Sequence, residues 1–139
     1  MSISEPIRKK FVEYIMLQVF DDQYIDRQEE KNILEEGIKM GIGVDEGLVI
    51  IRQVASEKSL VIERDVEERA QEVLEQFALN DGVIDKKEFE KTLTLFKSAC
   101  HGKVPDIAIK RRLKQMILTQ GWKVKEGGLF GSKWFSEIA

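Results

Sequence analysis

Cysteine and histidine are almost absent from this chain of 139 residues, which contains one of each, Cys100 and His101. A lone cysteine excludes a disulfide within the chain and fits a reducing compartment. One thiol and one imidazole cannot supply the four protein ligands of a structural zinc site. We therefore expect a buried thiol beside a histidine at a helix end, with neither a disulfide nor zinc holding the fold.

Long apolar runs and catalytic signatures are also lacking. No stretch of about 18 apolar residues occurs, and residues 1–6 have neither the basic nor the apolar region of a secretory signal. The chain has no glycine-rich phosphate loop, no second histidine and no serine or cysteine nucleophile in a recognisable setting. The sequence therefore predicts a cytoplasmic protein that is not an enzyme, while a hydrolase using carboxylates alone stays open.

Positive charge is scarce over most of the chain and gathers at its end. Residues 1–96 contain 13 Lys and Arg against 22 Asp and Glu, whereas residues 97–139 contain 9 against 3. The basic end suits an acidic partner, although a solvated basic face is the commoner meaning of such a count. The length favours one domain with a core of its own.

An acidic turn occurs twice in the chain, with its two copies 59 positions apart. The copies, residues 22–29 and 81–88, keep four residues in register. These pairs are Asp22 and Asp81, Ile25 and Ile84, Asp26 and Asp85, and Glu29 and Glu88. The repeat predicts an internal duplication in which the turn ends one helix and starts the next.

The second half of each turn has the pattern of a capping box. Asp85 can accept hydrogen bonds from the free amides of a helix start, while Glu88 reaches back to the Asp85 amide. Asp26 and Glu29 repeat this arrangement. Capping therefore accounts for these carboxylates without a further role.

The two turns differ at two positions. Ile84 and Phe89 can close a hydrophobic staple across the second cap, but Glu30 stands where Phe89 would be in the first copy. We therefore expect the first helix start to be held less firmly. Gly82 tolerates the positive φ of a sharp turn, and Gln23 replaces it in the first copy.

The same acids are candidate ligands for a divalent cation, which is the one cofactor that the sequence suggests. From its glycine onward the second turn resembles the last half of a calcium-binding EF-hand loop. The leading ligand positions hold Phe77 and Leu79, or Gln18 and Phe20 in the first copy, so calcium should bind weakly or not at all. A cation could still bind if both turns pool their oxygens. The candidate ligands are Asp22, Asp26, Glu29, Asp81, Asp85 and Glu88.

Apolar spacing predicts an all-α, single-domain helical bundle of about six helices, three in each repeat. The expected helices cover residues 6–20, 26–40, 45–55, 63–78, 85–100 and 105–120. The repeats are then residues 6–56 and 60–120, with residues 56–59 as a connector and residues 121–139 as an aromatic tail.

The tail contains both tryptophans of the chain. Alternation over residues 122–125, followed by two glycines, permits a small hairpin. We expect the tail to cover an edge of the core, and a stacking platform for nucleic acid is the alternative. The helix over residues 105–120 has a basic side that could meet a partner, a membrane surface or solvent. The candidate partner-binding residues are Lys110, Arg111, Lys114, Trp122 and Trp134.

Both acidic turns resemble the corners of the TerB-like family, which is named for tellurite resistance and also occurs fused to co-chaperone and other stress-related domains. The match is to residues 81–88 and, with Gln23 in place of glycine, to residues 22–29. The resemblance implies an all-α fold over residues 6–120 and leaves room for a divalent cation near the acids, but it implies no reaction.

The leading functional hypothesis is therefore a helical interaction module of the TerB-like kind, with another protein as its partner. A divalent-cation binder that uses the duplicated turns is the second hypothesis. A binder of nucleic acid or anionic surfaces that uses the basic end is the third.

Overall fold

The computed structural model describes residues 3–19, 22–127 and 133–139, and the chain forms two compact units, unit 1, Met1–Arg64, and unit 2, Asp65–Ala139. The described residues form six helices and four strands of two residues each. This confirms the predicted all-α bundle of six helices. No helix within these ranges is long and apolar enough to cross a membrane.

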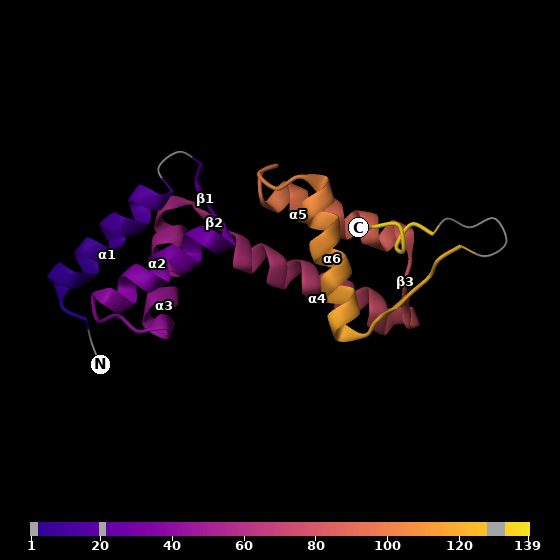
Figure 1. The fold of residues 1–139 in the computed structure, drawn as a ribbon, viewed down its shortest axis with the longest axis horizontal. Coiled ribbons are helices and arrows are strands. Elements are labelled where there is room, and N and C mark those ends of the chain that lie inside the picture. The colour runs from indigo at the N-terminus through magenta and orange to yellow at the C-terminus, as the bar shows by residue number, and fades with distance from the viewer. Residues whose placement is uncertain (1–2, 20–21, 128–132) are drawn as a thin grey trace. The chain divides into compact units, whose positions relative to one another are not determined.

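Unit 1 packs three helices around an apolar core (Figure 1). Its elements are α1 (Glu5–Gln18), β1 (Tyr24–Ile25), α2 (Arg27–Lys39), α3 (Val44–Lys58) and β2 (Val61–Ile62). Gly37 of α2 lets α1 approach closely, because a Cβ there would lie 3.0 Å from the fully buried ring of Phe11. The core residues are Phe11, Ile15, Val19, Ile25, Ile33, Ile42, Ile50, Ile51, Val54, Ala55 and Ile62.

Unit 2 has the same order of elements. They are α4 (Glu63–Asp81, whose first two residues count with unit 1), β3 (Val83–Ile84), α5 (Lys86–Ala99), α6 (Asp106–Gln120) and β4 (Lys123–Val124). The largest fully buried side chains of unit 2 are Leu74, Ile84, Phe96, Ile109, Leu113 and Ile117. Each unit thus buries its own apolar residues.

Two parallel strand pairs link the acidic turns to the ends of the third helices. In unit 1 Tyr24 pairs with Val61, and in unit 2 Val83 pairs with Lys123. Each third helix ends at a residue in the left-handed region, Ser59 or Gly121, which redirects the chain toward its strand. Apart from residues 123–124, the strands were not predicted, because two residues are too short for an alternating pattern to appear.

Helix bounds differ from the expected ones at two places. The third helix continues to Lys58, so most of the predicted connector is helical. The fourth helix continues through Leu79 to Asp81, beyond the end of its apolar stripe at Ala78. In both cases the added residues are exposed and lie off the apolar stripe, so the apolar periodicity does not show where the helix ends.

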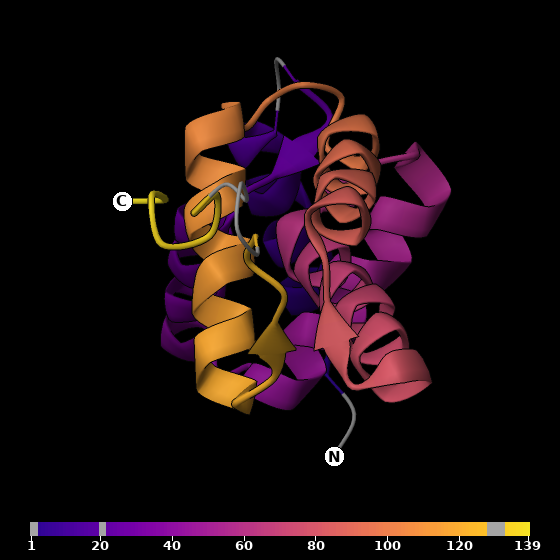
Figure 2. The same ribbon diagram turned by 90° about the vertical axis from the view of Figure 1, so that its right-hand side faces the viewer.

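Only the first arm of the small hairpin that the tail sequence permits lies fully within the described residues. Residues 123–124 are a strand, as their alternation suggested, but they pair in parallel with β3 of the acidic turn. Residues 128–132, which include part of the predicted hairpin, lie outside the described residues. The C-terminal segment, residues 133–139, lies beside α6 (Figure 2).

Candidate functional site

Both acidic turns form complete capping boxes. Asp26 Oδ1 accepts from the Glu29 amide at 2.7 Å, and Glu29 Oε1 accepts from the Asp26 amide at 3.0 Å. Asp85 and Glu88 make the same two bonds at the same two distances. The predicted caps are therefore confirmed, and each carboxylate already holds a free amide of a helix start.

The leading acid of each turn also binds the backbone. Asp22 Oδ1 accepts from the Tyr24 amide at 3.1 Å, and Asp81 Oδ1 accepts from the Val83 amide at 3.3 Å. In each turn the residue after the leading acid has a positive φ, which is +83 at Gly82 and +54 at Gln23. The first turn thus takes the same conformation without a glycine, at the cost of backbone strain.

The staple position is occupied differently in the two units. Phe89 is buried in unit 2, as predicted. Its counterpart Glu30 is also buried, and its Oε1 accepts from Arg64 Nη2 at 2.6 Å and from Arg64 Nε at 2.8 Å. Arg27 approaches the same oxygen at 3.5 Å. An ion pair therefore replaces the missing staple of the first turn.

Burial raises the pKa of Glu29 above its ordinary value of 4.5, and the neighbouring carboxylates of Asp26 and Asp22 raise it further. The hydrogen bond from the Asp26 amide acts in the opposite direction. The Glu29 carboxylate is thus crowded by the other carboxylates of its helix cap.

In the described residues no three Asp, Glu, His or Cys side chains are grouped so that they could hold a metal ion.

The early ligand positions of an EF-hand are helical in the second turn. Phe77 and Leu79 both lie in α4, which ends only at Asp81. An apolar helical turn thus stands where a calcium loop would begin, and the weak-calcium prediction keeps this physical basis.

An aromatic cluster joins the C-terminal segment to α5. The ring centroid of Phe89 lies 5.1 Å from that of Trp134 and 6.4 Å from that of Phe135, whose ring stands edge-on to it. Trp134 and Phe135 also meet edge to face at 5.6 Å. The Trp134 indole donates to the Lys125 carbonyl at 3.1 Å, so its polar edge is satisfied as well.

Two charged side chains hold the backbone of the C-terminal segment. Lys114 Nζ of α6 donates to the carbonyls of Phe135 at 3.1 Å and Ile138 at 2.8 Å, and it lies 5.1 Å from the Phe135 ring centroid. Glu126 accepts from the Ser136 hydroxyl at 2.7 Å and from the Ser136 amide at 3.2 Å. These hydrogen bonds from Ser136 lower the pKa of Glu126. We call Phe89, Lys114 and Glu126 the docking face.

A hollow lies beside the docked segment. Ile107 of α6 is 57% exposed there, and Lys110 of α6 and Lys86 and Glu90 of α5 line the same hollow. Trp134 and residues 137–139 line it as well. The segment therefore leaves the apolar side chain of Ile107 uncovered.

The structure brings together three of the five predicted partner-binding residues. Lys110 and Trp134 line the same hollow, and Lys114 holds the segment beside it. Arg111 is exposed on α6, and Trp122 is half-buried just after that helix. The prediction that the tail covers an edge of the core is confirmed by the buried Phe135.

Sequence reasoning missed Glu126, Phe135 and Ile107. Glu126 is one of three acids within residues 97–139, and its isolation in a basic region was a usable signal. Phe135 and Ile107 carried no pattern that separated them from ordinary core residues. Their roles follow from tertiary contacts alone.

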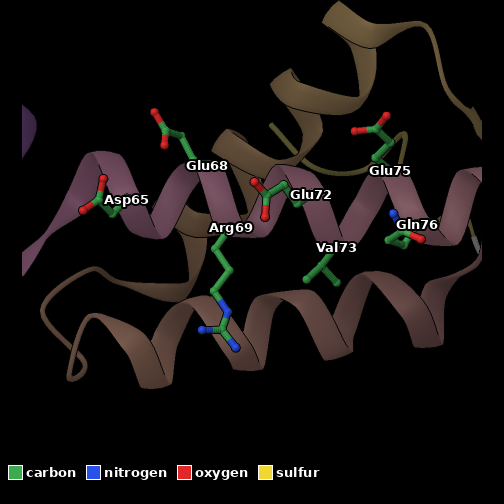
Figure 3. A pocket seen from close by; sticks show the side chains of 7 residues that line it. All are labelled: Asp65, Glu68, Arg69, Glu72, Val73, Glu75 and Gln76. Atoms are coloured by element: carbon green, nitrogen blue, oxygen red, sulfur yellow. The ribbon is translucent and has the colours of Figure 1, made fainter.

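A second surface runs along α4 (Figure 3). Its carboxylates are Asp65, Glu68, Glu72 and Glu75, and Arg69 and Val73 point away from Glu68 and Glu75. All of the described residues that line this hollow belong to the one helix. The surface has the form of a solvated helix face.

The single cysteine lies as expected. Cys100 is buried at the end of α5, and its Sγ lies 3.4 Å from the Lys97 carbonyl that it donates to. His101 follows it, exposed and with φ +53.

No family model, no curated protein and no solved structure matches this chain. The resemblance to the TerB-like family therefore rests on the residues of the two acidic turns.

Proposed function

We propose that this protein is a non-enzymatic helical interaction module, of the TerB-like and stress-associated kind, that acts in the cytoplasm and binds another protein through unit 2. The observation that supports this most is the docking face. Lys114 and Glu126 bind backbone and hydroxyl groups of a short chain segment, and Phe89 packs against its two rings. A surface of this kind is suited to holding a peptide.

Further support for a non-enzymatic role comes from the placement of the side chains that catalysis could use. The Cys100 thiol is buried and donates to a carbonyl, so it is not placed as a nucleophile. The carboxylates of both turns cap helices. The exposed basic and apolar residues Lys110, Arg111 and Ile107 lie instead on α6, where a partner can reach them.

Affinity capture from the native host tests the proposal. Wild type is compared with Lys110→Glu/Arg111→Glu, a variant in which two exposed charges of α6 are reversed. We expect one or a few proteins to be enriched with wild type, in amounts comparable to the bait, and to be depleted with the variant because rim charges control encounter. If no protein is enriched over an unrelated folded bait, the proposal is wrong.

A further inference from the structure

The docking face contacts chemical groups that other peptides also carry. Lys114 and Glu126 contact two carbonyls, one amide and one hydroxyl, which many short helical turns offer. Phe89 contacts two adjacent rings. The C-terminal segment fits because it supplies a pair of neighbouring aromatic residues within a single hydrogen-bonded turn, in which the Glu137 amide donates to the Lys133 carbonyl.

The C-terminal segment covers only part of the surface that an occupant of the docking face could contact. The exposed Ile107 side chain and the charges of Lys86, Glu90 and Lys110 line the hollow beside the segment. An occupant with one more apolar side chain could cover Ile107, which the segment leaves in water. Such an occupant would bury more apolar surface than the segment does.

Unit 1 provides a comparison within the same chain. Its third helix and second strand are offset from those of unit 2 by 62 positions, since Val44 corresponds to Asp106 and Val61 to Lys123. Arg52 and Arg64 then stand where unit 2 has Lys114 and Glu126. Glu30 stands where unit 2 has Phe89, and it is paired with Arg64.

At the corresponding positions, unit 1 therefore has neither an aromatic ring on which the segment could pack nor a carboxylate that could accept from a backbone amide. The features that hold the segment belong to unit 2 alone, so they are more than a consequence of the shared fold.

We propose that the C-terminal segment is the intramolecular occupant of a peptide-docking face, and that a partner protein displaces it with a short helical turn bearing two adjacent aromatic residues. This rests on the proposed function and names the chemistry of the partner. A tethered segment competes at an effective concentration of about a millimolar. At concentrations well below this, only a partner that also covers Ile107, or is locally concentrated, then displaces the segment.

Displacement can be followed on the wild-type protein by NMR. The probe is a synthetic peptide with the sequence of residues 133–139, added unlabelled to the ¹⁵N-labelled chain. We expect the indole signal of Trp134 to shift as its hydrogen bond to Lys125 is lost, while the indole signal of Trp122 stays in place. A peptide with both aromatic residues replaced by alanine is the control and should move neither signal.

A variant chain measures the competition directly. Trp134→Ala/Phe135→Ala removes the rings of the tethered segment, so the same peptide, now carrying a fluorescent label, should bind this chain about tenfold more tightly than it binds wild type. Adding Lys114→Ala should remove most of that gain, whereas adding Arg111→Ala, on the same helix and exposed, should leave it unchanged. Circular dichroism checks that each variant is folded, and the NMR experiment needs no variant.

Several outcomes overturn the proposal. One is a Trp134 signal that stays fixed up to several millimolar peptide, and another is equal affinity of wild type and Trp134→Ala/Phe135→Ala. If wild type sediments as a dimer and Phe135→Ala sediments as a monomer, the docking face binds a second copy of this chain instead. If protein capture succeeds while the Trp134 signal stays fixed, the interaction module stands and the docking face falls.

Discussion

Asp85 and Glu88 each accept a hydrogen bond from the other's backbone amide across the first turn of α5, at 2.7 and 3.0 Å. Asp26 and Glu29 repeat both distances at the start of α2. Each pair satisfies two amides that the helix itself leaves free. The duplicated acids are thus fixed by backbone geometry, and this leads to the first prediction.

Asp85→Ala should lower the free energy of unfolding by about 1 kcal/mol, because one helical amide loses its acceptor. Asp85→Ser should recover much of this loss. Added calcium, magnesium or zinc should change neither variant relative to chelator. Thermal melts of the three proteins provide the measurement, and a wild-type melting temperature that rises by several degrees with one cation would contradict the capping role.

Gln23→Gly should stabilise the protein. The left-handed conformation at φ +54 costs a residue with a Cβ about 1–2 kcal/mol. Glycine gives back about 0.4–1 kcal/mol through the greater freedom of the unfolded chain. The net gain should be about 0.5 kcal/mol in urea unfolding. The reverse change in the second turn, Gly82→Gln, should destabilise, and a Gln23→Gly protein weaker than wild type would show that the turn carries no strain.

Arg64→Met should destabilise unit 1 by about 3 kcal/mol, because the buried carboxylate of Glu30 loses its two short hydrogen bonds and keeps the longer contact to Arg27. The double variant Glu30→Leu/Arg64→Met should be more stable than Arg64→Met, since no buried charge is then left unpaired. A double-mutant cycle in urea gives the coupling. Additive effects would mean that the two side chains do not depend on each other.

Glu29→Gln should stabilise the protein at neutral pH and lose this advantage in acid. The folded pKa of Glu29 is raised, so the folded state binds its proton more readily than the unfolded state. Its contribution to stability is fully present below the ordinary value of 4.5 and is lost as the pH rises through the folded pKa. Glutamine keeps the capping box without the charge. Melting temperatures of both proteins between neutral pH and pH 4 test this, and a constant difference would refute it.

Lys114→Met should cost about 1 kcal/mol, because two carbonyls of the C-terminal segment lose their donor. The red shift of tryptophan emission should begin at a lower urea concentration than in wild type as Trp134 leaves Phe89. Lys110→Met on the same helix is the matched control and should change neither quantity. Unchanged emission in Lys114→Met would show that the rings alone hold the segment.

The capping boxes and the six helices could be predicted because their signals are local. Asp85 and Glu88 are three residues apart, and apolar spacing repeats within each helix. The strand pairs could not be predicted in this way, since Tyr24 and Val61 are separated in the chain by the two helices α2 and α3. The docking face likewise depends on contacts between distant residues, such as Lys114 with Ile138.

Glu30 shows the same limit at one position. The sequence indicated correctly that the hydrophobic staple was missing there. It did not indicate that Arg64 would be placed to neutralise the charge, 34 positions later in the chain. Local sequence patterns therefore predicted the missing staple at Glu30 but not the ion pair with Arg64 that replaces it.

The exchange of Phe89 for Glu30 and of Glu126 for Arg64 between the two repeats also bears on how the chain folds. A duplicated chain offers its last segment two similar surfaces during folding, and a wrong pairing would be a kinetic trap. On unit 1 the rings of Trp134 and Phe135 would meet a buried ion pair in place of an aromatic floor, and the Ser136 hydroxyl would meet a guanidinium in place of a carboxylate. Misdocked chains would gain little from that contact and would release it quickly, so we expect these two differences between the repeats to favour docking of the C-terminal segment on unit 2.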